Sequence, residues 1–304
     1  MLELGTGETR GEGTTSAGTY TAQAPTEPRP EIWFKRRVSL VSAVREVWAF
    51  RELVATLVER DLRVRYKQAA LGLAWAVISP VMEMIAFTVL FTKVTQINIQ
   101  MPGVPYVLFS YLGLIPWTFF ASAISGGGSS LTSNVALLNK LYCPREVFPL
   151  AAMGDACFDA LIASIILLAL FPISGFAPKI ETLWFPIVLL PLFMAAIGLA
   201  LVTSVITVYV RDFAQIVPMV IQIGLFATPV AYPLQKLIHN HTAQLVYSAV
   251  NPIAPVLDSL RRTVLQGQAP NFAALAIGGA SAFLMMTVGY VIFKRLETGI
   301  ADVA

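Results

Sequence analysis

The sequence predicts an all-α integral membrane protein with six transmembrane helices, an N-terminal amphipathic helix and a re-entrant segment between the last two spans. Only 13% of the 304 residues are charged and 56% are hydrophobic, whereas a soluble domain carries about 25% charged residues. The apolar residues gather in six stretches that approach or exceed the ~20 residues needed to cross the hydrocarbon core. Lysine and arginine residues concentrate in alternate connections between these stretches.

Residues 1–30 are predicted to be a disordered extension, and residues 31–304 to be the membrane domain. The extension is rich in Gly, Thr, Pro and Glu and has almost no large apolar side chains. It therefore cannot bury enough surface to offset the entropy lost on ordering. It also lacks the apolar region of a secretory signal peptide.

Residues 43–68 predict an amphipathic interface helix. Leu53, Leu57, Val58 and Leu62 recur at helical spacing among arginine and glutamate residues. This pattern suits a helix that lies in the membrane interface, with its cations among the lipid headgroups. A solvated surface helix is the alternative, but the direct continuation of the segment into a predicted span favours the interface.

Proline residues predict irregular helices in two of the spans. Pro116 lies in the second span, and Pro218 and Pro229 lie in the fifth, so we expect both to be bent or broken. Residues 233–271 are moderately apolar and predict one or two short helices that dip back into the outer leaflet. The six predicted spans are residues 72–92, 106–125, 147–171, 184–210, 213–232 and 272–293.

The distribution of cations predicts that both chain termini are cytoplasmic. With that orientation, sixteen of the 21 lysine and arginine residues lie on the inner side of the membrane and five on the outer side. This bias follows the positive-inside rule, and the opposite orientation would reverse it. We therefore expect a multi-pass protein of the cytoplasmic (inner) membrane.

The longest inner connection, residues 126–146, is predicted to be a loop that contains a short helix. It opens with three glycines at 126–128, whose spacing does not fit a dinucleotide-binding fingerprint and is typical of a flexible hinge. Ser129 or Ser130 is suited to cap the short helix, and Pro144 to end it.

The motifs that enzymes and ATPases need are missing from this sequence. No Gly-Lys dipeptide occurs, so the chain has no phosphate-binding loop, and it has no H-E-x-x-H zinc motif. His239 and His241 form at most a weak two-ligand metal site. Cys143 and Cys157 are too few for a disulfide framework and are expected to be buried, inert thiols. We therefore expect a non-enzymatic chain that binds no metal or cofactor.

Three carboxylates fall inside predicted spans and are candidates for function. Glu83 lies near the middle of the first span, and Asp155 and Asp159 lie one helical turn apart in the third. Ionisable residues at membrane depth commonly serve transport, and a proton-coupled carrier would need such a carboxylate. Hydrogen bonding between helices, in a bundle or an oligomer interface, is the alternative.

Aromatic residues crowd the first two predicted spans. Tryptophan and tyrosine belts at the membrane interface account for many of them. Sugars, however, stack their apolar faces on aromatic rings, so a ring-lined path would suit a glycan. The candidates for such a path are Trp75, Phe87, Trp117, Phe119 and Phe120.

Ordered blocks over roughly residues 50–265 resemble the type-2 ABC exporter permeases, which serve O-antigen, capsule and related polysaccharide export. The blocks are Arg60-Asp61-Leu62-Arg63-Val64-Arg65-Tyr66-Lys67-Gln68, Leu71-Gly72, Gly113-Leu114-Ile115-Pro116-Trp117, Pro144-Arg145-Glu146-Val147, Val210-Arg211-Asp212-Phe213 and Asn251-Pro252. Their fixed order makes the resemblance specific at the level of the family. The N-terminal 30 residues are not part of the pattern.

The resemblance implies a homodimeric permease that works with two copies of a separate ATPase subunit, which binds ATP and Mg. The cargo would be a polysaccharide or a lipid-linked glycan, carried on a polyprenyl diphosphate and moved from the cytoplasm to the outer face. Membrane lipids would be partners and nucleic acid would not. The alternatives are a drug or small-lipid exporter permease of the same fold, an integral-membrane transferase, and a proton-coupled secondary carrier.

The resemblance also implies roles for individual residues. Charge reversal at Arg145 or Glu146 is expected to uncouple ATP hydrolysis from export while the fold stays intact. The residues that correspond to the ATPase-coupling region are Asn134, Leu137, Lys140, Tyr142, Pro144, Arg145 and Glu146.

Cations of the interface helix lie where a lipid diphosphate could be met at headgroup level. These are Arg63, Arg65 and Lys67, and positive charge suits that place. Anchoring of the helix to the membrane accounts for the same cations equally well. Arg211 and Asp212, between the fourth and fifth spans, are further polar candidates.

Overall fold

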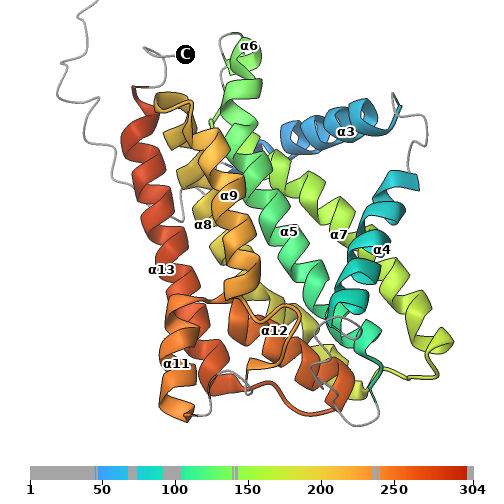
Figure 1. The fold of residues 1–304 in the computed structure, drawn as a ribbon. Coiled ribbons are helices and arrows are strands. Elements are labelled where there is room, and N and C mark those ends of the chain that lie inside the picture. Colours follow the sequence, from blue (N-terminus) through green and yellow to red (C-terminus); the bar gives the residue numbers. More distant parts are fainter. Residues whose placement is uncertain are drawn as a thin grey trace, which may run out of the picture. The chain divides into compact units, whose positions relative to one another are not determined.

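The computed structural model describes residues 45, 47–67, 74–91, 104–138, 140, 143–234, 238 and 240–299. They all belong to one compact unit that covers residues 38–304. Within these ranges the regular elements are all helices, as predicted (Figure 1). Residues 1–30, Tyr142, His239 and the outermost residues of the segments predicted at 43–68 and 72–92 lie outside the described residues.

In the part of the chain that the structure describes, four helices are long and apolar enough to cross a membrane. They coincide with the spans predicted second, third, fourth and sixth. The 28 residues of the first of them extend over ~42 Å at 1.5 Å per residue. These helices are α5 (Tyr106–Ser133), α7 (Val147–Ile173), α8 (Phe185–Tyr209, continued backward by the short helix η2, Ile180–Trp184) and α13 (Phe272–Glu297).

Two shorter apolar helices occupy the predicted first and fifth spans. Helix α4 (Ala74–Val89) has 16 residues and α9 (Phe213–Ala227) has 15, so they extend over only ~24 and ~22 Å. Helix α9 ends before Pro229, which confirms a break in the predicted fifth span. Helix α5, in contrast, continues through Pro116 as a single helix.

The glycine run at 126–128 is not a hinge, so that prediction was wrong. Helix α5 extends through it to Ser133, and the short helix is the single turn α6 (Val135–Leu138). A Cβ atom on Gly127 would lie 2.7 Å from the Cβ of Ala200 in α8. The glycines therefore let α5 and α8 approach closely, which small residues commonly do between membrane helices.

Ser129 and Ser130 also differ from the prediction, because both lie inside α5 and neither caps α6. The hydroxyl of Ser130 donates to the carbonyl of Gly127 at 2.6 Å. Asn134 makes the transition between the two helices, and its side-chain amide donates to the carbonyl of Ser130 at 2.9 Å. Helix α6 is thus joined to α5 without a flexible loop.

The chain alternates between two ends, which we call the α6 end and the α12 end (Figure 1). At the α6 end, the hydroxyl of Tyr209 in α8 donates to the carbonyl of Leu296 in α13 at 2.6 Å. Helix α3 (Arg51–Lys67) lies at this end too and packs against α7 through Leu57. Figure 1 shows α3 lying across the long helices rather than along them.

The α12 end contains helices α11 (His241–Val250) and α12 (Ile253–Arg261) and the π-helical turn η3 (Arg262–Gln266). Helix α12 is almost wholly buried and packs against α5, α8 and α13. Its last residue, Arg261, was counted among the outer cations of the sequence. The structure instead buries it, with the guanidinium 3.9 Å from the ring centroid of Phe109.

Arg261 ties α12 to the chain that follows α9. Its Nη1 donates to the carbonyl of Pro229 at 2.7 Å, and its Nη2 donates to the carbonyl of Val230. These carbonyls lie just beyond the end of α9, where no helix supplies donors for them. The buried cation therefore satisfies backbone that would otherwise be left without partners.

The packing of α8 against α13 should tolerate no side chain at Gly198. A Cβ there would lie 2.6 Å from the backbone carbonyl oxygen of Met285, so we expect Gly198→Ala to destabilise the protein by about 1–3 kcal/mol. Thermal unfolding in detergent, followed by tryptophan fluorescence, measures this. Gly126→Ala is the matched control, because its Cβ would lie 3.5 Å from the nearest atom. Equal unfolding temperatures for the two variants would contradict the prediction.

Candidate functional site

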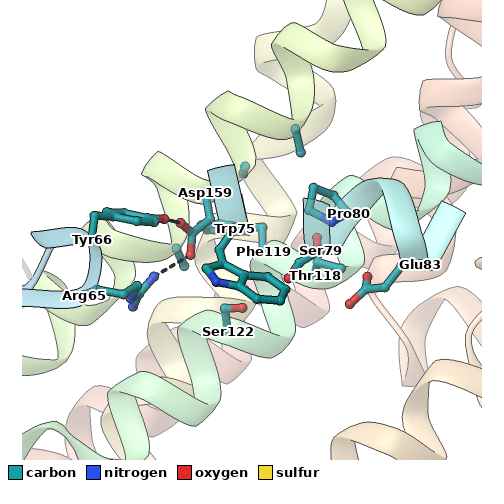
Figure 2. Close-up of a pocket in the computed structure, with 13 residues that line it drawn as sticks. Arg65, Tyr66, Trp75, Ser79, Pro80, Glu83, Thr118, Phe119, Ser122 and Asp159 are labelled. Atoms are coloured by element: carbon teal, nitrogen blue, oxygen red, sulfur yellow. Dashed lines mark hydrogen bonds and ion pairs between the residues drawn. The ribbon is translucent and has the colours of Figure 1, made fainter. Parts of the chain in front are cut away.

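A cavity of about 330 Å³ lies where the end of α3 meets α4, α5 and α7, and we call it the mixed pocket (Figure 2). Its lining combines charged, hydroxyl-bearing and aromatic side chains. Five residues singled out from the sequence for different reasons meet there. They are Arg65, Trp75, Glu83, Phe119 and Asp159.

One carboxylate of α7 fixes the two α3 side chains that line the pocket. Asp159 accepts from Nη1 of Arg65 and from the hydroxyl of Tyr66, each at 2.7 Å (Figure 2). Burial, followed by the contact with Asp159, raises the pKa of Tyr66 to about 12. The ion pair is partly exposed and contributes only ~0–1 kcal/mol, but it neutralises Arg65.

Helix α4 supplies the opposite side of the pocket. Trp75, Ser79 and Glu83 follow one another at a spacing of four residues, so they share one face of α4 (Figure 2). Glu83 is exposed, and among the described residues it has no hydrogen-bond or ion-pair partner. An unpaired carboxylate on an apolar helix faces water or a cavity rather than lipid. We therefore expect this face of α4 to lie toward the cavity or a water-filled space rather than toward lipid.

Helix α5 closes the pocket with Thr118, Phe119 and Ser122. Phe119 is buried, and its ring centroid lies 4.8 Å from that of Phe193 in α8. The hydroxyl of Thr118 donates to the carbonyl of Ile115 at 3.0 Å, so its oxygen can still accept a hydrogen bond. The pocket thus offers both apolar ring surface and several acceptors.

The other aromatic candidates for a glycan path lie elsewhere. Trp117 and Phe120 are buried and pack on each other, with centroids 5.9 Å apart. Phe87 stacks on Phe91 at 6.1 Å. These three rings fill space between helices, which the sequence alone could not distinguish from lining a path.

The three headgroup cations of α3 differ in their surroundings. Arg65 lines the mixed pocket but is paired with Asp159. Arg63 forms an ion pair with Glu59 one turn earlier on α3. Lys67 is exposed at the C-terminal end of the helix. Neither Arg63 nor Lys67 belongs to the pocket lining.

A second cavity, of about 410 Å³, lies beside the mixed pocket toward the α6 end, between α3, α5 and α7. Arg60 bridges it, donating to Asp61 and, at 2.8 Å, to the side chain of Asn134. Asp155 is buried in its wall, and its Oδ1 has no hydrogen-bond partner in the described part of the chain. Arg60 and Asn134 are 74 residues apart in the sequence, so no local sequence pattern indicated this hydrogen bond.

The residues predicted to couple to an ATPase divide into two groups. Arg145 donates to the backbone carbonyl of Glu297, and Glu146 pairs with Lys294. Glu146 is only 3% exposed, and its burial raises its pKa while Lys294 opposes that shift. Both residues therefore fasten the start of α7 to the end of α13. We therefore expect charge reversal at Glu146 to disturb the fold, contrary to the expectation from the sequence.

The remaining coupling candidates lie around α6. Lys140 is exposed, whereas Asn134, Leu137 and Pro144 are half-buried. Arg211 and Asp212 are exposed in the turn between α8 and α9. The hydrogen bond of Tyr209 to α13 brings that turn to the same α6 end.

The cysteines and possible metal ligands were also located. Cys143 and Cys157 are both free thiols and half-buried. Burial raises the pKa of Cys143. Among the described residues, no group of three or more His, Cys, Asp or Glu side chains is arranged to hold a metal ion.

Breaking the buried pair of Glu146 and Lys294 should destabilise the protein. We expect Glu146→Lys to lower the free energy of unfolding by about 3 kcal/mol, because it leaves like charges together at a buried position. The double variant Glu146→Lys with Lys294→Glu should recover part of this loss. Unfolding in detergent measures both variants, and a single variant as stable as the wild type would refute the structural role.

Several transport proteins are similar in sequence to this chain over nearly the whole predicted membrane domain. The O-antigen export system permease protein RfbA of Myxococcus xanthus is 29% identical over 259 residues, covering 85% of this chain and 98% of the relative. RfbA of Klebsiella pneumoniae is 26% identical, covering 83% and 95%. The polysialic acid transport protein KpsM of Escherichia coli is 22% identical, covering 80% and 93%.

The family assignment rests on a match that includes the site. Residues 52–265 match the family described as ABC-2 type transporter, and this range contains every residue of α3, α4, α5 and α7 that lines the mixed pocket. Together with the long apolar helices, the match makes this a multi-pass membrane protein. The chain belongs to the ABC-2 type transporter family.

Proposed function

We propose that this chain is the permease subunit of an ATP-driven exporter that moves a polysaccharide or lipid-linked glycan from the cytoplasm to the outer face. Family membership and the functions for which the relatives are named, O-antigen export and polysialic acid transport, support the class of cargo. The mixed pocket is the observation that carries the proposal. It combines an exposed tryptophan with carboxylates and hydroxyls on an aqueous face.

The chemistry of the pocket suits a sugar ring. Trp75 is 49% exposed, so the indole face is free to stack against the apolar face of a sugar. Glu83 and the hydroxyls of Ser79 and Ser122 lie around it to bond sugar hydroxyl groups, and hydrogen bonds to a charged acceptor are the stronger kind. Phe119 adds ring surface from the α5 side.

A polyprenyl diphosphate would be bound outside the mixed pocket. Arg65 is already neutralised by Asp159, and Glu83 adds a negative charge, so the pocket repels an anion. Lys67 is exposed at the end of α3, where the lipid headgroups of the inner leaflet would lie. The diphosphate would therefore contact Lys67, with Arg63 nearby, while the glycan enters the pocket.

The proposed assembly contains two copies of this chain and two ATPase subunits, which bind ATP and Mg. Helices α4 and α9 would cross the membrane with the four longer helices, giving six spans. The α6 end would be cytoplasmic, as would both chain termini, and the chain would reside in the cytoplasmic membrane. Helices α11 and α12 would form the re-entrant segment, consistent with the burial of α12 in protein.

The proposed coupling runs from α6 into the pocket. The ATPases would dock around α6, where Lys140 is exposed. Asn134 at the base of α6 is bonded to Arg60 of α3, and α3 carries Arg65 and Tyr66 into the pocket wall. Closure of the ATPases on ATP would thus move α5 and α3 together and open the path for the glycan.

Charge reversal at Lys140 should uncouple hydrolysis from export. Lys140→Glu alters an exposed residue, so we expect normal expression and unfolding temperature but at least a several-fold loss of export per ATP hydrolysed. The measurement compares ATP hydrolysis and glycan export in proteoliposomes that contain the whole complex. Lys179→Glu, exposed beside the α12 end, is the matched control. Coupling equal to wild type in Lys140→Glu would exclude α6 as the docking element.

Removal of the Trp75 ring should reduce export with little effect on stability. Base–aromatic stacking is worth ~1–3 kcal/mol per ring by alanine substitution, and we expect a comparable loss for a sugar, or about tenfold in export efficiency for Trp75→Ala. Trp75→Phe should retain most of the activity. Unfolding temperature serves as the control. Full export by the alanine variant would show that the glycan does not use this ring.

Co-purification with the ATPase encoded nearest to this chain tests the proposal as a whole. Native mass spectrometry in mild detergent should give two permeases, two ATPases and a bound glycolipid. A permease that recruits no ATPase would contradict the proposal and favour a proton-coupled carrier. A complete complex whose hydrolysis responds to small lipids or drugs but not to glycans would favour a drug or small-lipid exporter.

A further inference from the structure

We infer that Glu83 makes the mixed pocket select against glycans that carry carboxylate sugars, so that the cargo of this exporter is built from neutral or amino sugars. The inference rests on the proposed function and names the class of sugar that the same site admits. It gives a specific role to the only charged side chain of α4 among the described residues.

The charges around the pocket do not cancel. Arg65 and Asp159 neutralise each other across 2.7 Å, which leaves Glu83 as the uncompensated charge of the lining. Arg65 also lines the neighbouring cavity, which adds Arg60, Asp61 and Asp155, so the two cavities together hold two arginines and four carboxylates. A glycan that passes α3 therefore meets a net negative charge over the two cavities taken together.

The position of Glu83 allows its charge to act on a glycan bound at Trp75. It lies two turns beyond Trp75 on the same face of α4 (Figure 2), or ~12 Å along the helix axis, so a glycan bound along this face, with one ring stacked on the indole, would extend toward the carboxylate. Neutral sugars can donate hydroxyl hydrogen bonds to it, and amino sugars can donate charged ones. A sugar carboxylate offers no donor and is repelled, by roughly tenfold in affinity at the effective dielectric constant of partly exposed sites.

One alternative role for Glu83 is a hydrogen bond to another helix of the same chain, and the contacts argue against it. Hydrogen bonding within the helix bundle would give the carboxylate a partner, and none is found for it among the described residues. Asp159, in contrast, does have two such partners. The two carboxylates of the pocket therefore differ, one holding α3 in place and the other left available to a ligand.

The test compares two glycans on the intact complex of permease and ATPase in lipid nanodiscs. The probes are a neutral mannose oligosaccharide and a sialic acid oligosaccharide of equal length, each with a fluorescent label. Wild type should bind the neutral probe about tenfold more tightly, and Glu83→Gln should bring the ratio of dissociation constants close to one by improving binding of the acidic probe. Glu52→Gln, whose carboxylate is 91% exposed near the start of α3, is the matched control.

The outcomes separate the inference from the proposed function. The inference would be overturned if the wild type bound both probes equally well or bound the acidic probe more tightly. It would also be overturned if Glu83→Gln left the ratio of dissociation constants unchanged, or if neither probe bound. ATP-dependent export by the assembled complex reports on the proposed function independently, because it does not depend on which sugar is preferred. Raising the salt concentration to 1 M should also reduce the wild-type ratio, since it shortens the screening length to about 3 Å.

Discussion

The close contact of α5 with α7 and α8 determines where every other part of the structure can lie. Glycine at position 127 lets the backbones of α5 and α8 meet, so α5 runs through the interior for most of its length. One helix consequently contributes to both cavities, carries α6 at one end and supports α12 at the other. Lipid chains are as apolar as leucine, so this fit of small residues, rather than hydrophobicity, holds the helices together.

The apolar segments were predictable because a bilayer imposes a length and a composition on any helix that crosses it. Four of the six predicted spans correspond to long apolar helices, and the end of α9 before Pro229 follows from the chemistry of proline. The glycine run at 126–128 was misread, because glycine serves both in hinges and in close helix contacts. Only the partner, Ala200 of α8, distinguishes the two uses.

The site was predicted in pieces but not as a whole. Arg65, Trp75 and Glu83 were each chosen from a local pattern, and Phe119 was grouped with rings that prove to be core. What joins them is Asp159, 94 residues from Arg65, and no periodicity reports a contact at that distance. The same limit applied to Glu146, whose burial against Lys294 turned a candidate docking residue into a structural one.

An unpaired carboxylate at membrane depth affects how a membrane protein prevents ions from leaking across the bilayer. Glu83 needs hydration whenever it is ionised, so the space beside α4 must hold water even when no cargo is present. The barrier to ion leakage must then lie at another level of the membrane. Phe109, Arg261 and the turn after α9 form a closely packed layer toward the α12 end, and we expect the barrier to ions to lie there.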